Sequence, residues 1–201
     1  MKQGICTTIA FCACGLLGAT ASSVLAQEHA AHVHGEAHLD MALEGTALSL
    51  QLESPLDNLL GFERAPGNPA EEDKAKRMSA TLRAADRLFA LTPAAGCALE
   101  KVTLESSALT AELLGEAGNA TEREHEHEHG APHEHDDEDE AGHADLDASW
   151  QFHCARPEAL RAVEIRLFHS FPGLHTLRVR AATPKGQRGA TLTPENRTLT
   201  W

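Results

Sequence analysis

The residues with the clearest metal-binding chemistry lie in one polar run near the middle of the chain. Residues 116–145 contain six histidines and twelve acidic residues against one arginine, and no apolar residue larger than alanine. Such a segment has nothing to bury in a core and its like charges repel, so we expect a solvated, disordered loop. A purely acidic linker has no need of imidazoles, which are common ligands of zinc, copper and nickel. The run therefore predicts a loop that collects divalent metal ions through His125, His127, His129, His133, His135 and His143.

A second group of histidines lies where apolar and polar residues alternate. The apolar residues from Val33 to Leu43 share one parity, which predicts a strand with one buried face. Alternate residues of a strand point to the same side about 7 Å apart, so the polar face offers ligands for a tetrahedral zinc ion. The simpler alternative is a solvent-facing polar strand. The candidate ligands are His29, His32, His34, Glu36, His38 and Asp40.

Three other histidines are isolated, and each alone is typical of a surface residue. His153 lies beside Cys154, and His169 and His175 flank a Phe-Pro-Gly turn. If the N-terminal hairpin pairs near these strands, His153 or His175 would complete the metal site.

The first 26 residues are typical of a secretory leader, with a basic start, an apolar run and small residues before Ala26. We expect cleavage after Ala26. The apolar run is shorter than the roughly 20 residues that cross a bilayer, and no later segment approaches that length. We therefore expect an exported mature protein without membrane insertion.

Removal of the leader leaves two cysteines, Cys97 and Cys154. Two cysteines in an exported chain favour one disulfide, which would close a loop around the histidine-rich insert. The alternative is a pair of thiolate metal ligands.

The remaining pattern indicates several strands and one main helix. Alternation resumes after a turn at residues 44–46 and predicts a hairpin. Pro69 to Leu91 is predicted to be a helix, because acidic residues open it and an apolar stripe follows. Short helical turns are expected at 54–60 and 157–160, and further strands at 98–109, 146–154, 163–168, 174–181 and 188–193, with Leu199 and Trp201 in a last one.

These elements predict an α+β domain: a mostly antiparallel sheet with one main helix, interrupted by the insert. Its two parts, 27–114 and 146–201, flank the insert 115–145 and are long enough for one core. The mature chain has 16 basic and 30 acidic residues, a net charge of −14, of which −11 belongs to residues 116–145. Cations rather than nucleic acid are the natural partners, since no basic patch or aromatic stacking platform is apparent.

An enzyme is disfavoured by the motifs. The sequence has no nucleophile elbow, no Gly-rich phosphate loop and no HExxH helix. A metallohydrolase would also need a preformed metal site with an open position beside a pocket.

Several blocks resemble the zinc-regulated periplasmic proteins (ZrgA-like) of Gram-negative bacteria, a family linked to zinc acquisition. They are HVHGEAHLDMALEG, LQLESPLDNLLGFE, the His-rich insert, WQFHCARPEAL, LFHSFPGLHTLRV and Trp201, in the family's order. The resemblance implies a periplasmic, non-enzymatic protein that serves zinc uptake or homeostasis when zinc is scarce. It implies His32, His34 and His38 as the N-terminal ligand group and the insert histidines as a variable metal-rich loop. It also supplies zinc as the metal, because the residues alone allow copper or nickel equally.

The leading hypothesis is a periplasmic protein that captures or buffers zinc and hands it to an importer component. One alternative is a protein that sequesters excess copper or nickel. Another is an assembly module whose acidic loop is only a spacer.

Overall fold

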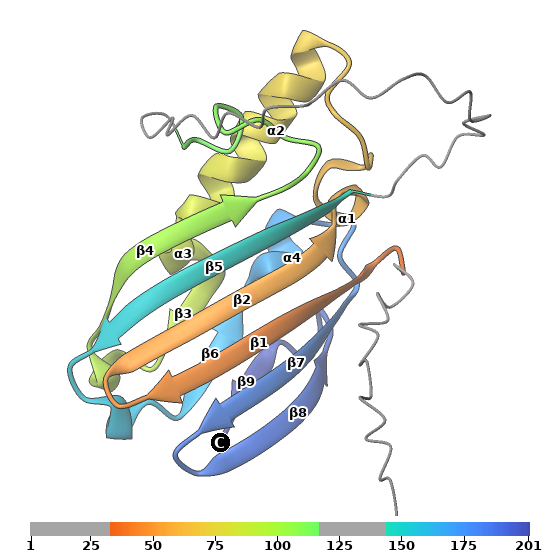
Figure 1. The fold of residues 1–201 in the computed structure, drawn as a ribbon. Helices are drawn as coiled ribbons and strands as arrows, with labels where there is room; N and C mark the ends of the chain where they lie inside the picture. The colour runs from red at the N-terminus through yellow and green to blue at the C-terminus, as the bar shows by residue number, and fades with distance from the viewer. Residues whose placement is uncertain (1–32, 117–143) are drawn as a thin grey trace, which may run out of the picture. The chain divides into compact units, whose positions relative to one another are not determined.

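The chain builds a six-stranded sheet in which segments distant in the sequence lie side by side (Figure 1). The computed structural model describes residues 33–116 and 144–201, which belong to one compact unit, His32–Trp201. The strand order is β4-β5-β2-β1-β7-β8, so β5, which follows the insert, lies between two strands that precede it. The strands are β1 (Glu36–Glu44), β2 (Ala47–Pro55), β4 (Cys97–Glu105), β5 (Asp145–Cys154), β7 (Thr176–Thr183) and β8 (Gly186–Leu192).

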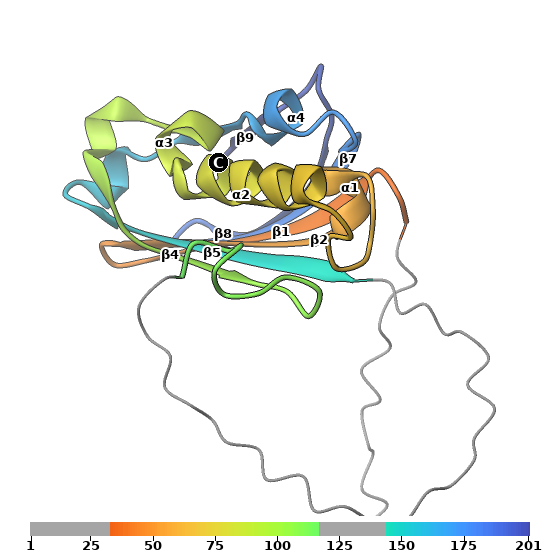
Figure 2. The same ribbon diagram turned by 90° about the horizontal axis from the view of Figure 1, so that it is seen from above.

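The helices and a three-stranded sheet, β3-β6-β9, make a second layer (Figure 2). The helices lie over one face of the large sheet. The elements of this layer are α1 (Leu56–Leu60), α2 (Pro69–Arg83), α3 (Ala85–Leu88), α4 (Leu167–Ser170), β3 (Phe89–Leu91), β6 (Ala162–Ile165) and β9 (Thr198–Thr200), with 3-10 turns at Pro93–Ala95 and Pro157–Ala159.

The core lies between these layers. It contains the apolar side chains that alternate with polar ones along each central strand. In β1 and β2 every second residue is buried, as the alternation predicted. Trp150 of β5 is fully buried near the middle of the core, and its ring packs edge-on against Phe89 with centroids 4.8 Å apart. The indole Nε1–H donates to the Leu82 carbonyl at 2.7 Å, so the one polar atom of this side chain is satisfied.

The predicted α+β class is confirmed, but three local predictions were wrong. The helix expected from Pro69 to Leu91 ends at Arg83, because Ala84 leaves helical geometry, Leu82 binds Trp150, and residues 89–91 pair with β6. Residues 167–168 lie in α4 rather than in a strand. The strand expected at 98–109 ends at Glu105. The sheet contains one parallel pair, β1 with β7, and its other neighbours are antiparallel.

Cys97 and Cys154 form the expected disulfide. They face each other across β4 and β5, with a sequence separation of 57. The bond rules out their alternative role as thiolate ligands in this oxidised form. The predicted leader, His29, His32 and the six insert histidines lie outside the described residues. None of the helices in 33–116 and 144–201 has the length and hydropathy of a membrane-spanning helix.

We expect removal of the disulfide to lower the free energy of unfolding by about 4 kcal/mol, because the bond restricts a long loop in the unfolded chain. The variant is Cys97→Ser with Cys154→Ala, compared with the parent by urea denaturation. A reductant should destabilise the parent by a similar amount and leave the variant unchanged. A loss below about 1 kcal/mol would contradict the entropic argument.

Candidate metal-binding surfaces

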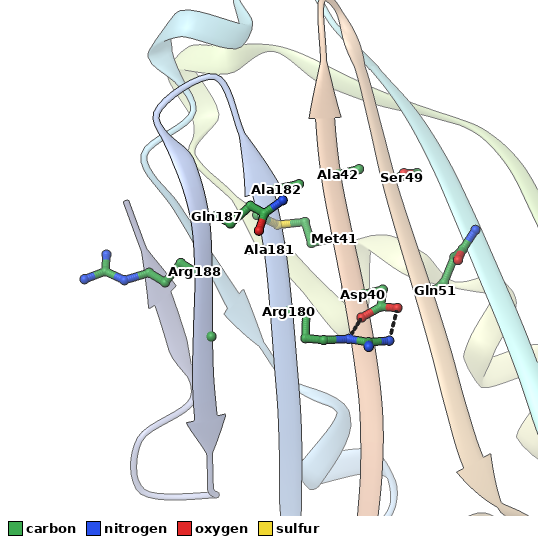
Figure 3. A pocket seen from close by; sticks show the side chains of 11 residues that line it. Asp40, Met41, Ala42, Ser49, Gln51, Arg180, Ala181, Ala182, Gln187 and Arg188 are labelled. Atoms are coloured by element: carbon green, nitrogen blue, oxygen red, sulfur yellow. Dashed lines mark hydrogen bonds and ion pairs between the residues drawn. The ribbon is translucent and has the colours of Figure 1, made fainter. Parts of the chain in front are cut away.

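The predicted ligands of β1 do share one solvent-facing side of the sheet, but arginines from β7 join them there. The parallel pairing places Arg178 beside His38 and Arg180 beside Asp40. Arg180 donates two hydrogen bonds to Asp40, Nε to Oδ1 at 2.7 Å and Nη2 to Oδ2 at 2.6 Å (Figure 3). Arg178 donates from Nε to Glu36 Oε1. Both carboxylates are therefore already engaged by guanidinium groups.

These ion pairs shift the pKa values of their members. The hydrogen bond from Arg178 lowers the pKa of Glu36, and the same contact raises the pKa of Arg178. Asp40 likewise raises the pKa of Arg180, again chiefly through the hydrogen bond. A metal ion at Glu36 or Asp40 must compete with an arginine, so these two positions are weaker ligand candidates than the sequence alone suggests.

The surface beside this pair is a shallow hollow of about 590 Å³ across β2, β1, β7 and β8 (Figure 3). Its floor is formed largely by small side chains such as Ala42, Ala182 and Ser49, with Gln51 and Gln187 nearby. Its charged residues are the Asp40–Arg180 pair, which is internally neutral, and Arg188 of β8. The hollow therefore has no concentrated charge for capturing a cation.

A row of acidic residues crosses the same face next to His38. His38 is paired in register with Glu53, Glu53 with Asp147, and Asp147 with Glu105. Burial, followed by the charges of Glu53, Asp145 and Glu105, raises the pKa of Asp147. The row attracts cations by its charge, and it lies where β5 begins after the insert.

His34 lies apart from this face, in the turn that precedes β1. Its Nε2 is 3.0 Å from Glu63 Oε1, and its Nδ1 is 3.8 Å from Asp57 Oδ2 of α1. The imidazole is about half exposed, whereas the Glu63 side chain is only 12% exposed. His34 and His38 therefore face different surroundings, although both belong to the predicted N-terminal ligand group.

His34 lies at a corner of the fold that is built by α1. We call this region the α1 corner and define it as Gly35, His34, Asp57, Asn58 and Glu63. The Asn58 side chain accepts from the Gly35 N–H at 2.6 Å and donates to the Glu36 carbonyl at 2.8 Å. Gly35 has a φ of +83°, which favours glycine. This backbone conformation turns the chain just before β1 and leaves the His34 side chain beside α1.

Two further segments reach the α1 corner. The Leu56 N–H donates to the Ala144 carbonyl at 2.9 Å, which ties the end of the insert to the start of α1. The His175 N–H donates to the Gly35 carbonyl at 2.8 Å, and its ring would lie 2.9 Å from a Cβ at position 35. The fold thus places the N-terminal histidine, the end of the insert and His175 in one region.

The other histidines considered in the sequence lie elsewhere. His153 is paired in register with Ala47, near the end of β1 opposite to Glu36, so it does not complete a site with His34. His169 lies on α4, at a hollow lined by arginines. Within residues 33–116 and 144–201, no group of three or more His, Cys, Asp and Glu side chains is arranged to hold a metal ion.

Sequence reasoning missed Asp57 and Glu63 as neighbours of His34. Both belong to LQLESPLDNLLGFE, one of the blocks that carried the family resemblance. Their spacing from the histidine, 23 and 29 residues, follows no local period, so only the tertiary fold shows their proximity.

The comparisons define the class of protein to which this fold and these surfaces belong. The model of the ZrgA family, described as "ZrgA family zinc uptake protein", matches residues 31–201. The chain therefore belongs to the ZrgA family of zinc uptake proteins. A comparison with curated protein sequences finds no match.

Replacement of Asp147 should relieve the repulsion within the acidic row. Because the folded state raises the pKa of this acid above its ordinary value of 3.8, its ionised form costs stability at neutral pH. We expect Asp147→Asn to raise the free energy of unfolding at pH 7 by a few tenths of a kcal/mol, as for like charges on neighbouring strands. The gain should vanish as the pH falls well below 3.8.

The measurement is urea denaturation of Asp147→Asn at neutral and strongly acidic pH. Glu72→Gln, which changes an exposed carboxylate on α2, is the matched control. Equal effects of the two substitutions at neutral pH would contradict the repulsive row.

Proposed function

We propose that this protein captures zinc in the periplasm and supports its uptake by passing the ion to an importer component. The observation that carries the proposal is the position of His34 between Glu63 and Asp57 in a member of a zinc uptake family. Imidazole nitrogen and carboxylate oxygen are ligands that zinc prefers. The family description supports zinc as the cargo ahead of copper or nickel.

His34 and Glu63 are the ligand pair that we assign at the α1 corner. The Nε2 of His34 faces Glu63 Oε1 at 3.0 Å, while Nδ1 faces the Asp57 carboxylate on the other side. A carboxylate at the second ring nitrogen is the usual partner of a metal-binding histidine, because it sets the tautomer and the ring orientation. Asp57 is therefore assigned a positioning role.

Two protein ligands make an exchangeable site rather than a storage site. Zinc would complete its tetrahedral set with water or with two other predicted ligands, His32 and His143. His32 precedes His34 by two residues, and His143 directly precedes Ala144, whose carbonyl is bonded to α1. Incomplete coordination suits a protein that must release its ion to an acceptor.

The insert supplies capacity in this proposal. Its six histidines and its acidic residues offer many weak ligands, and each bound ion must order a piece of chain, which lowers affinity. The acidic row of Glu53, Asp147 and Glu105 adds negative charge beside the strand that follows the insert. We propose a binding protein and not an enzyme, since the sequence carries no catalytic motif.

Zinc titration followed by native mass spectrometry distinguishes binding at the α1 corner from binding by the insert. The samples are residues 27–201 and a variant in which a Gly-Ser linker replaces 117–142, which keeps His143, Glu116 bonded to Arg83 and Ala144 bonded to Leu56. We expect the variant to keep one ion and to lose several weaker ones. If the variant binds none, the α1 corner is not a zinc site. If neither sample binds zinc at micromolar concentration, the spacer alternative replaces the whole proposal.

Substitutions at the α1 corner test the assigned roles in the variant without the insert. Glu63→Gln and Asp57→Asn are each expected to weaken zinc binding about tenfold or more, as loss of a ligand or of its orienting carboxylate does. Glu72→Gln is the control. Because all three changes are nearly isosteric, thermal unfolding in the absence of zinc should show an intact fold. Unchanged zinc affinity in both corner variants would overturn the assignment and leave capture by the insert standing.

A further inference from the structure

A basic hollow lies in the layer of helices, away from the surfaces described above. It encloses about 550 Å³ beside α3 and α4, and its ionisable wall residues are Arg87, Arg166, Arg197 and His169. Figure 2 shows both helices on the same side of the large sheet. Three arginines around one hollow contrast with a chain whose formal net charge is −13.

Backbone hydrogen bonds fix the arginines relative to one another. The Arg166 N–H donates to the carbonyl of Leu88, the neighbour of Arg87, at 2.8 Å. The Ile165 N–H donates to the Arg197 carbonyl at 2.8 Å. Leu88 and Ile165 are buried in the core, so the three elements that supply the guanidinium groups are held together rigidly.

Glu164 shows that a carboxylate fits between these guanidinium groups. Its Oε2 lies 3.1 Å from Arg166 Nη2, and its Oε1 lies 3.0 Å from Arg197 Nε. The contact with Arg166, followed by that with Arg197, lowers the pKa of Glu164. One carboxylate balances one of the three arginines, and Arg87 takes no part in the Glu164 contacts.

We propose that this hollow binds a small anion that carries two or more carboxylates. Its volume is within the roughly 300–1,000 Å³ of small-molecule sites, so it suits a compact ligand better than a protein surface. Arginine pairs with carboxylates through two parallel hydrogen bonds, and N–H groups not used by Glu164 remain to donate to such a ligand. The ring of the nearly buried Phe168 and the Ser170 side chain complete the wall.

Calorimetric titration of residues 27–201 with citrate tests this assignment. Metal is removed beforehand with a chelating resin, because EDTA is itself a polycarboxylate that would compete for the hollow. The ionic strength is low because exposed ion pairs are screened by salt. We expect saturable binding that Arg87→Ala and Arg197→Ala each weaken at least fivefold. Arg77→Ala, which removes an exposed arginine of α2, should leave the affinity unchanged.

Three results would overturn the proposal. One is the absence of citrate binding at millimolar concentration. Another is equal weakening by Arg77→Ala and Arg87→Ala, which would indicate a general charge effect. The third is tighter binding of inorganic phosphate than of citrate, which would assign the hollow to a different anion. Thermal unfolding of Arg87→Ala matching the parent shows that a loss of binding is local.

Discussion

The buried Asn58 side chain is the polar contact on which the start of β1 depends. It is 2% exposed and bonds the Gly35 N–H, the Glu36 carbonyl and the Ser54 hydroxyl. Its backbone is also crowded by Gly173, where a Cβ would lie 2.7 Å from the Asn58 carbonyl oxygen. Because a buried amide without partners is costly, one residue joins α1, β1 and the turn before β7 in a single arrangement.

The register of β1 against β7 follows from this junction, and it decides the charge of the sheet's open face. Parallel neighbours need a long connection, and here β7 comes from the far end of the chain. The pairing places Arg178 and Arg180 next to the polar residues of β1 and engages both carboxylates of the predicted ligand face in ion pairs. The acidic row of Glu53, Asp147 and Glu105 lies on the neighbouring strands β2, β5 and β4.

The same junction separates two histidines that the sequence pattern groups together. His34 precedes the strand and faces Asp57 and Glu63, whereas His38 stays on the sheet between Glu53 and Arg178. The types of ligand were predictable, because imidazole and carboxylate are concentrated there. Their grouping into sites was not, because it depends on a turn at Gly35 and on a short helix more than twenty residues away.

Local periodicity and the cysteine count predicted the strands with one buried face, the start of the main helix, the α+β class and the Cys97–Cys154 disulfide. These features depend on burial along one segment or on simple counting. Tertiary structure alone decided the break at Ala84, where Trp150 and the β3–β6 pairing outweigh helix propensity, and the parallel contact of β1 with β7. It also decided which acids face His34. Each of these depends on contacts between residues far apart in sequence. A local sequence pattern does not reveal the free energy of such contacts.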